Sequence, residues 1–484
     1  MEFLWHDYET FGTVPAVDRP CQFAACRTDA DLNPVGEPLE MYCAPADDVL
    51  PRPGACLVTG ITPQLAAQEG RVEAEFARII HKEMMKPGTC SAGYNSIRFD
   101  DEVSRNLFYR NLLDPYEREW KNGNSRWDLI NLTRMCYALR PQGIEWPMVE
   151  TSSGSSGTRP SFRLEDLTQA NGIGHQDAHD ALADVNATIE MARVIRAAQP
   201  RLFEWSLKLR NKFEARKLLD VDAGTPVIHT SGRIPAVRGC TSLVLPLAPH
   251  PRNDKAVIVF DLMGDAEALL QCDAESIRDR VFTPSADLPE DVKRLPLKAI
   301  KWNAVPMVAP AAVLKGVDQD RIGLDSAKCL KNAALLNANI VELQQSVMNA
   351  FHTEFEAREI DPDLAIYSGG FFDDYDRQQM LHIHQCTPGE LAAKNWEFHD
   401  KRLTKMLLRF RARNWPDTLS QDDWDAWESD RHQRLKQPAD GEFYGIDAFN
   451  QDLAAAREQK KTDPEAMRIL DELEGWAINL KLKD

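Results

Sequence analysis

The first 199 residues alternate short apolar stretches with longer amphipathic ones. Phe3–Tyr8 is rich in apolar and aromatic residues and is short enough to be a buried β-strand. Residues 181–197 carry apolar side chains at spacings of three and four, which predicts a helix. Alternating strands and helices are typical of an α/β layer fold. We therefore expect an α/β domain over residues 1–199.

The pattern changes after residue 199. Short β-like runs at 226–229, 242–245 and 256–260 are separated by glycine and proline, which indicates a small β-barrel. The remainder is strongly charged and is predicted to be mostly helical. A chain of 484 residues is also too long for one ordinary core. We expect a second domain over residues 200–350 and a helical third domain over residues 351–484.

Two carboxylates lie at the end of the first predicted strand. Asp7 and Glu9 are two residues apart, so in a strand they project from the same side. Carboxylates held this close repel each other unless a cation lies between them. Oxygen ligands favour a hard ion such as Mg²⁺ or Mn²⁺. The alternative interpretation of an isolated Asp-x-Glu pair is a strand end that simply reaches solvent.

Further candidate residues occur much later in the chain. Asp100 follows Phe99, and His179 precedes Asp184 by five positions. The order Asp-x-Glu, Phe-Asp, His-x4-Asp resembles the DEDDh group of 3′→5′ exonucleases. The separations are those that an α/β domain of about 200 residues would give. The resemblance implies a ribonuclease-H-like fold and phosphodiester hydrolysis with two metal ions.

Several longer segments are similar to the bacterial exodeoxyribonuclease I family. They are His6–Thr13, Asp18–Ala25, Arg98–Val103, Ser125–Leu129, Ala178–Ala181, Gln199–Phe203 and Arg411–Asn414. This resemblance spans nearly the whole chain. It implies a ribonuclease-H-like exonuclease domain, then an SH3-like β-barrel and a helical C-terminal domain. The polar segment Glu150–Thr158 departs from the family and should be a flexible loop.

The resemblance also implies an activity and roles for the five candidate residues. The activity is degradation of single-stranded DNA from the 3′ end to nucleoside 5′-monophosphates, in DNA repair or recombination. Two Mg²⁺ ions, or Mn²⁺ in their place, would be the cofactors. Asp7 would be the shared ligand, Glu9 and Asp184 would complete one metal site, and Asp100 would help to hold the second ion. His179 would act as the general base, a task for which an imidazole pKa near 6.5 is suitable.

Substrate contacts are expected at other positions. The family binds a terminal nucleotide through an arginine, a role that we assign to Arg163, and Glu9 is expected to contact the substrate too. Guanidinium geometry matches a phosphate, although a structural ion pair would also explain Arg163. Single-strand binding needs base stacking and phosphate contacts, which ordinary packing or surface charge can resemble in a sequence. The candidates for these contacts are Arg105, Tyr116, Trp120 and Arg134.

The formal net charge of −18 is unfavourable for long-range attraction to DNA. Basic residues are nevertheless clustered in Lys401–Arg413, which contains six of them and no acid. In a helix, Lys401, Lys405 and Arg409 would share one face. That face is either simply solvated or an anion-binding surface for DNA or for a partner. The partner implied by the resemblance is the single-stranded DNA-binding protein, whose acidic C-terminal tail would dock here or on basic residues of the middle domain.

Other features bear on compartment and assembly. No stretch of about 18 apolar residues occurs, so we expect no transmembrane helix. The sequence does not begin with a signal-peptide pattern. Ten cysteines are scattered without a Cys-x-x-Cys motif, which favours free thiols in the cytoplasm over structural zinc. A monomer follows from the resemblance alone.

Two alternative functions remain at this point. An RNA 3′-trimming exonuclease would use the same four acids and the same histidine. The long region after residue 199 argues against it, because small RNA trimmers of this fold typically lack such a region. A catalytically inactive single-strand DNA-binding protein would be expected to have lost at least one of the acids, and all four are present.

Overall fold

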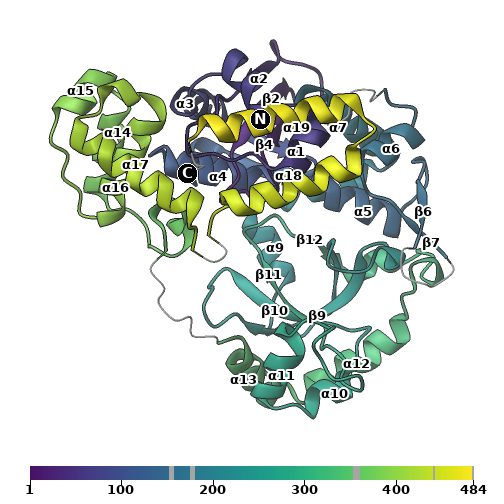
Figure 1. Ribbon diagram of the computed structural model, residues 1–484. Coiled ribbons are helices and arrows are strands. Elements are labelled where there is room, and N and C mark those ends of the chain that lie inside the picture. Colours follow the sequence, from purple (N-terminus) through teal and green to yellow (C-terminus); the bar gives the residue numbers. More distant parts are fainter. Residues whose placement is uncertain (152–156, 175–179, 353–359, 440–441, 482–484) are drawn as a thin grey trace. The chain divides into compact units, whose positions relative to one another are not determined.

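The structure of the chain is a computed structural model (Figure 1) that forms two compact units. The first unit joins both ends of the chain, because it consists of Met1–Ser125, Gln176–Asn186 and Arg358–Asp484. The second consists of Arg126–His175 and Ala187–Ala357. The described residues are 1–151, 157–174, 180–352, 360–439 and 442–481.

The first unit contains four strands of a mixed β-sheet, and the fifth strand begins at Ser125, the last residue of the unit's first segment. The strand order of the sheet is β3-β2-β1-β4-β5, with β1 antiparallel to β2 and parallel to β4. The strands are β1 (Glu2–Thr10), β2 (Pro20–Thr28), β3 (Leu39–Tyr42), β4 (Thr89–Gly93) and β5 (Ser125–Asp128). The helices between them are α1 (Pro53–Thr59), α2 (Pro63–Glu69), α3 (Glu73–Met84) and α4 (Asp100–Arg110). The predicted α/β fold and its first buried strand are confirmed.

Strand β1 extends beyond its parallel neighbour β4. The pairing of the two strands ends at Trp5 and Ala92, whereas β1 continues to Thr10. A Cβ atom on Gly93 would lie 3.0 Å from the His6 carbonyl oxygen, so glycine permits the close approach where β4 ends. Beyond Trp5, the carboxyl end of β1 therefore has no parallel strand paired beside it among the described strands. In α/β sheets, ligands bind at the carboxyl ends of parallel strands.

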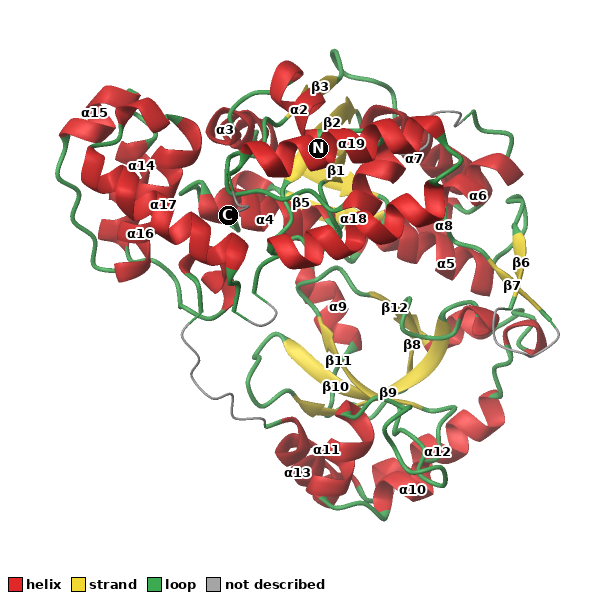
Figure 2. Cartoon of the chain, viewed as in Figure 1, coloured by secondary structure: helices red, strands yellow, loops and turns green. Residues whose placement is uncertain are grey.

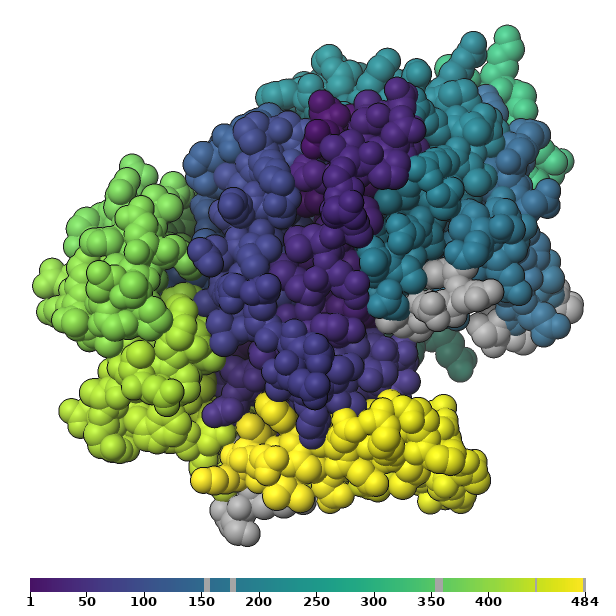
Figure 3. All heavy atoms as spheres, turned by 90° about the horizontal axis from the view of Figure 1, so that it is seen from above, coloured from purple at the N-terminus to yellow at the C-terminus, as the bar shows by residue number. Residues whose placement is uncertain are grey.

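C-terminal helices complete the core of the first unit. They include α14 (Asp374–Ile383), α15 (Pro388–Ala393), α16 (Lys401–Asn414), α17 (Gln421–Lys436), α18 (Ile446–Lys460) and α19 (Pro464–Asn479). Phe11 and Leu50 share one hydrophobic cluster with Phe449, Leu470 and Leu473 from α18 and α19. Figure 3 shows the yellow C-terminal helices against the purple N-terminal segments. The N-terminal α/β layer therefore depends on the end of the chain for part of its hydrophobic core.

The second unit contains an antiparallel sheet with strand order β11-β10-β9-β8-β12 (Figure 2). Its strands are β8 (Val227–Thr230), β9 (Thr241–Pro249), β10 (Ala256–Asp261), β11 (Leu297–Lys301) and β12 (Met307–Pro310). The three predicted β-like runs lie in β8, β9 and β10 and are confirmed. The unit also contains α5 (Leu129–Leu139), α6 (Leu164–Ala170), α8 (Pro200–Lys208), α9 (Lys212–Leu218), α10 (Ala266–Leu270), α11 (Ala274–Phe282), α12 (Ser326–Ala338) and α13 (Ile340–Phe351).

Helix α7 (Ala181–Ala198) agrees with the helix predicted over residues 181–197. The segment predicted as a polar loop follows β6 (Met148–Glu150) and leads into β7 (Thr158–Pro160), and residues 152–156 within it lie outside the described part of the chain. Within the described residues, no helix combines the length and the apolar character that crossing a membrane requires.

Candidate functional site

Asp7, Glu9 and Asp184 form a compact carboxylate cluster. One carboxylate oxygen from each residue lies within 4.8 Å of those of the other two. Asp7 and Glu9 come from the C-terminal half of β1, and Asp184 comes from the first turn of α7. All three side chains are half-buried. The structure thus brings together acids that are up to 177 positions apart in the sequence.

Asp100 joins the cluster at the first residue of α4. Its side chain is buried, and its Oδ1 accepts a hydrogen bond from the backbone N–H of Tyr8 at 3.1 Å. Tyr8 lies beyond the part of β1 that pairs with β4, so Asp100 accepts from an N–H that β4 does not reach. This bond fixes a fourth carboxylate beside the residue that separates Asp7 from Glu9.

The electrostatics of the cluster favour a bound cation. Burial raises the pKa of Asp7 well above its usual range, and the charges of Asp100 and Glu9 raise it further. Burial and the charge of Asp184 likewise raise the pKa of Glu9 to about 8. Removing carboxylates from water while they repel one another is unfavourable. A divalent cation would offset both costs, and a donor set made only of oxygens fits Mg²⁺ or Mn²⁺.

His179, the predicted base, lies outside the described residues. The next residue, Asp180, is described and caps α7: its Oδ2 accepts a hydrogen bond from the backbone N–H of Ala183 at 3.1 Å. Asp184 follows within the same turn, and its backbone N–H donates to the Asp180 carbonyl at 3.0 Å. The start of the helix that carries the metal-ligand candidate is therefore well defined.

Three of the predicted DNA contacts lie together in the first unit. Arg105 donates to both carboxylate oxygens of Glu119 at 2.7 and 3.0 Å and to Glu102 at 2.6 Å. Its guanidinium also lies 5.6 Å from the centre of the Tyr116 ring. Trp120 is 65% exposed. Arg105 thus already has two acidic partners, whereas the Trp120 ring is available for stacking.

Two aromatic residues beside this group were not predicted from the sequence. The hydroxyl of Tyr367 accepts a hydrogen bond from Arg105 at 3.2 Å. Phe371 is 81% exposed, and its ring lies edge-on to Tyr116 with 5.9 Å between the centroids. Tyr116 and Phe371 line a cavity of about 560 Å³. The Tyr-Ser-Gly-Gly-Phe-Phe segment at 367–372 was the available signal, since exposed aromatics beside glycines seldom serve only a core.

The other two predicted contacts belong to the second unit. The Arg163 side chain is 69% exposed and forms an ion pair with Glu165. Arg134 is half-buried; it donates to Asn131 Oδ1 at 3.0 Å, and its guanidinium lies 5.8 Å from the Phe162 ring centre. Arg163 has an exposed guanidinium that can reach an anion, while Arg134 is partly used in packing.

The expectation that Lys401, Lys405 and Arg409 share one accessible basic face is wrong for Arg409, which is buried; Lys401 and Lys405 are exposed, and binding of an anion or a partner on this helix stays a prediction. This segment forms α16, and its Arg409 is only 1% exposed, with N–O distances of 2.6 Å to Asp361 and 2.9 Å to Asp430. Lys405 pairs with Asp430 at 2.8 Å. The acids that pair with Lys405 and Arg409 come from distant segments, so the local sequence does not reveal them. The same helix places Leu403, Met406, Leu407 and Phe410 in a hydrophobic cluster.

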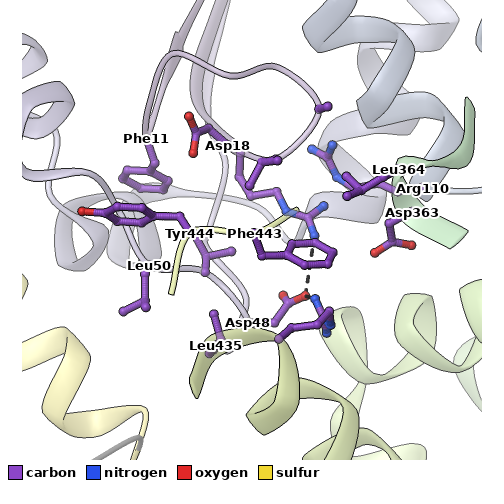
Figure 4. Close-up of a pocket in the computed structure, with 15 residues that line it drawn as sticks. Phe11, Asp18, Asp48, Leu50, Arg110, Asp363, Leu364, Leu435, Phe443 and Tyr444 are labelled. Carbon is purple, nitrogen blue, oxygen red and sulfur yellow. Dashed lines mark hydrogen bonds and ion pairs between the residues drawn. The ribbon is translucent and has the colours of Figure 1, made fainter. Parts of the chain in front are cut away.

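Arg413 of this helix enters a buried ionic network that contacts the N-terminal segments. Asp48 accepts from Arg413 at 2.7 Å and from Arg434 at 2.8 Å, and Arg19 lies 3.5 Å away. Burial would raise the pKa of Asp48, but these arginines outweigh burial and hold it well below its usual range. Figure 4 shows the pocket beside this network, with Asp48 below the Phe443 ring.

Comparison with known proteins gives matches along almost the entire chain. Residues 4–192 match the family model described as Exonuclease, residues 210–353 match the Exonuclease I SH3-like domain, and residues 360–480 match the Exonuclease I C-terminal domain. The order of the three matches is the predicted order of an exonuclease domain, an SH3-like domain and a C-terminal domain.

Full-length relatives give the same result. Exodeoxyribonuclease I of Escherichia coli K12 is 48% identical over 435 residues, which cover 89% of each chain. The solved structure of E. coli exonuclease I with a dA16 oligonucleotide has a TM-score of 0.93 at 45% identity and 99% coverage of both chains. The zinc-bound E. coli enzyme with single-stranded DNA has a TM-score of 0.92 at 44% identity and 99% coverage of both chains. The chain belongs to the exodeoxyribonuclease I family.

Proposed function

We propose that the protein is an exodeoxyribonuclease that degrades single-stranded DNA in the 3′→5′ direction and releases nucleoside 5′-monophosphates. The observation that supports this most strongly is the carboxylate cluster of Asp7, Glu9 and Asp184, with Asp100 beside it. Relatives that cover 89% of the chain are exodeoxyribonucleases, and related structures contain single-stranded oligonucleotides. A role in DNA repair or recombination is proposed from the family alone.

The proposed cofactors are two Mg²⁺ ions, with Mn²⁺ able to take their place. Asp7 would contribute to both sites, Glu9 and Asp184 would complete one, and Asp100 would help to hold the other. When bound, such ions lower the pKa of the attacking water and stabilise the leaving oxygen. The raised pKa values of Asp7 and Glu9 support a cation-binding role, and a related enzyme has been solved with zinc.

The chain's own side chains would position the substrate and move its proton. His179 is proposed to remove the proton from the attacking water, with Asp180 fixing the start of the adjoining helix. Arg163 is proposed to bind a phosphate of the terminal nucleotide, and Glu9 to contact the same nucleotide. The exposure of the Arg163 guanidinium supports this role, because an exposed guanidinium can donate to a phosphate as well as to Glu165.

Base stacking is proposed for the aromatic group in the first unit. Trp120 and Phe371 are exposed, and Tyr116 and Tyr367 lie beside them around Arg105. Arg134 of the second unit is proposed as a further strand contact. Aromatic rings stack on every type of base, so such a surface binds single strands with little sequence preference. Bases in a duplex are already stacked on one another, and a duplex should therefore be a poor substrate.

The proposed protein partner is the single-stranded DNA-binding protein, through its acidic C-terminal tail. Because Arg409 of α16 is buried and Lys405 is paired with Asp430, we propose that the tail docks on basic residues of the middle domain. Arg233 is exposed and forms no ion pair within the described residues, and with burial it lowers the pKa of Lys298 to about 8. We further propose a monomer in the cytoplasm. All ten cysteines lie in the described part of the chain and are free thiols, which supports a reducing compartment.

A direct assay separates this function from its alternatives. The purified chain is incubated with matched single-stranded DNA, duplex DNA and RNA oligonucleotides in Mg²⁺ and in EDTA. Release of labelled mononucleotides from the 3′ end of single-stranded DNA only, and only in Mg²⁺, is the expected result. Preferred degradation of RNA would favour an RNA-trimming enzyme. Tight binding of the DNA without cleavage would instead identify a non-catalytic binding protein.

A further inference from the structure

Gln22 is a buried polar residue on β2 that directly adjoins the carboxylate cluster. It is the cross-strand partner of Glu9 in the pairing of β1 with β2, and its side chain is almost fully buried. Buried amides in cores are costly unless their hydrogen-bonding groups are satisfied. The hydrogen-bond partners of the Gln22 side chain therefore indicate its role in the structure.

The carboxamide of Gln22 connects three separate segments. Its Nε2 donates to Asp180 Oδ1 at 3.1 Å and to Glu40 Oε1 at 3.0 Å and lies 3.5 Å from the Tyr42 hydroxyl, and its Oε1 accepts from the backbone N–H of Ala181 at 3.3 Å. Both protons of the amide are thus directed to carboxylates, while its oxygen accepts one of the N–H groups that a helix start leaves without a helical partner. A carboxylate has no proton to donate to Asp180 and Glu40, and an ammonium or guanidinium group has no oxygen to accept from Ala181, so a charged side chain could not replace the amide.

The same contacts bear on the cluster through α7. Asp180 is bound by Gln22 through one oxygen and caps Ala183 through the other. Ala181 is the first residue of the helix, and Asp184 is one turn later. The first turn of α7 is consequently attached to β2 at the position opposite Glu9.

We propose that Gln22 is a positioning residue that holds Asp184 against Asp7 and Glu9 in the geometry needed for a divalent cation. This proposal rests on the proposed function, because it assumes that these acids bind the metal. Gln22 itself carries no charge and would not bind the ion. Its amide instead fixes a helix terminus between two carboxylates, Asp180 and Glu40, that would otherwise repel each other. Partners that orient metal ligands typically change metal affinity by about 10- to 100-fold when removed.

The main test is Gln22→Met, which preserves side-chain length and volume and removes the hydrogen bonds of the carboxamide. Binding of Mn²⁺ to the full-length, metal-free chain is measured by titration calorimetry. We expect the Mn²⁺ affinity to fall by about 10- to 100-fold. The matched control is Thr28→Val on the same strand, because the hydroxyl of buried Thr28 accepts its hydrogen bond from Trp5 Nε1 of β1, at 2.9 Å, and not from α7. This control should lower the melting temperature and leave the Mn²⁺ affinity unchanged.

A second pair of variants tests the specific contact with Asp180. Gln22→Glu places a third carboxylate between Asp180 and Glu40, so Mn²⁺ affinity should fall further than in Gln22→Met. Adding Asp180→Asn restores a donor–acceptor pair with the roles exchanged, because the asparagine can donate to the new carboxylate and still cap Ala183. The double variant should recover most of the Mn²⁺ affinity that Gln22→Glu loses, which a purely structural defect would not do.

The outcomes separate this inference from the function on which it rests. If the wild-type chain binds no Mn²⁺ at the cluster, then the proposed metal site itself is wrong. If the wild-type chain binds Mn²⁺ and folded Gln22→Met binds it within twofold, only the positioning role is overturned. An equal loss of affinity in Thr28→Val would also overturn it, because general destabilisation of β2 would then explain the effect. Failure of Asp180→Asn to rescue Gln22→Glu would contradict the proposed contact.

Discussion

Arg413 and Asp48 are 365 positions apart in the chain, yet they form a buried ion pair with an N–O distance of 2.7 Å. Arg413 belongs to α16, and Asp48 lies in the loop after β3. Glu73, at the start of α3, contributes to the same buried region through Arg110 at 2.9 Å and Arg19 at 3.5 Å. Removing one partner of such a pair leaves an unpaired buried charge. The resulting loss in the free energy of unfolding exceeds the net contribution of the intact pair.

Acid should therefore destabilise the first unit. Burial would raise the pKa of Glu73, but Arg110 and Arg19 outweigh it and lower the pKa to about 2. A carboxylate with a lowered folded-state pKa stabilises the fold above its unfolded pKa, and this contribution is lost as pH falls towards the folded value. We expect the melting temperature to fall between about pH 4.5 and pH 2. Calorimetry across this range should give a shallower decline for Glu73→Gln, which is less stable at pH 7. An equally steep decline would contradict the assignment.

Asp7→Asn should abolish nuclease activity and raise the melting temperature of the metal-free protein. The pKa of Asp7 is raised in the fold, so above its unfolded pKa the ionised carboxylate destabilises the native state, and a neutral amide removes this cost. Activity should fall by about 10³-fold or more, since metal catalysis contributes several kcal/mol. Thermal melts in EDTA and in Mn²⁺ provide the measurement. The control is Glu2→Gln, at the opposite end of β1, and normal turnover by Asp7→Asn would refute the metal site.

His179→Ala should reduce the cleavage rate by roughly 10²- to 10⁴-fold, the usual contribution of a general base. The affinity for single-stranded DNA should remain nearly unchanged, because the carboxylates and the aromatic group are intact. Single-turnover kinetics and fluorescence anisotropy measure the two quantities separately. His432→Ala on α17 is a suitable control. A parallel loss of rate and affinity would identify His179 as a binding residue instead of a base.

Phe371→Ala and Trp120→Ala should weaken binding of single-stranded DNA while leaving the catalytic rate at saturation unchanged. Stacking contributes about 1–3 kcal/mol per base, which corresponds to an increase of about 5- to 150-fold in Kd. Anisotropy with oligonucleotides of increasing length measures this effect. Phe282→Ala is the control, because this ring is also exposed but lies in the second unit. If affinity is unaffected in both variants, this surface does not bind the strand.

Arg233→Glu should weaken binding of an acidic, apolar-ended tail peptide, whereas Lys405→Glu should not. Lys405 is already paired with Asp430, and Arg233 is not paired with an acid in the described residues. Higher salt should weaken the wild-type interaction, because exposed charges are screened over about 8–10 Å near physiological ionic strength. Titration calorimetry at two salt concentrations is the measurement. Undetectable binding at low salt would argue against this partner. Weaker peptide binding in Lys405→Glu but not in Arg233→Glu would instead indicate that the tail docks on α16.

Local patterns predicted much of the fold and of the carboxylate cluster. Strand β1 and helix α7 are each recognisable from their own periodicity, and Asp7, Glu9 and Asp184 follow from the positions of acids within them. The resemblance to a known family supplied Asp100 and its order in the chain. These features were accessible because each depends on neighbouring residues or on a motif.

Other features depend on contacts between distant segments and could not be predicted in this way. Three basic side chains of α16, Lys405, Arg409 and Arg413, pair with acids that are distant in the sequence: Asp430, Asp361 and Asp48. The positions of Tyr367 and Phe371 beside Tyr116 follow from the packing of the C-terminal region. Charged and aromatic residues can be counted in a sequence, but the side chains that they contact are determined only when the chain folds.

The shared core of Phe11 with Leu470 and Leu473 has a consequence for the synthesis of this protein. Translation proceeds at about 5–20 residues per second, so roughly 25 to 95 s separate the appearance of the first strand from that of α19. During this interval, the nascent N-terminal layer lacks part of its apolar covering. The apolar surface around Phe11 and Leu50 is therefore exposed until α18 and α19 emerge from the ribosome, which makes the unfinished chain prone to aggregation.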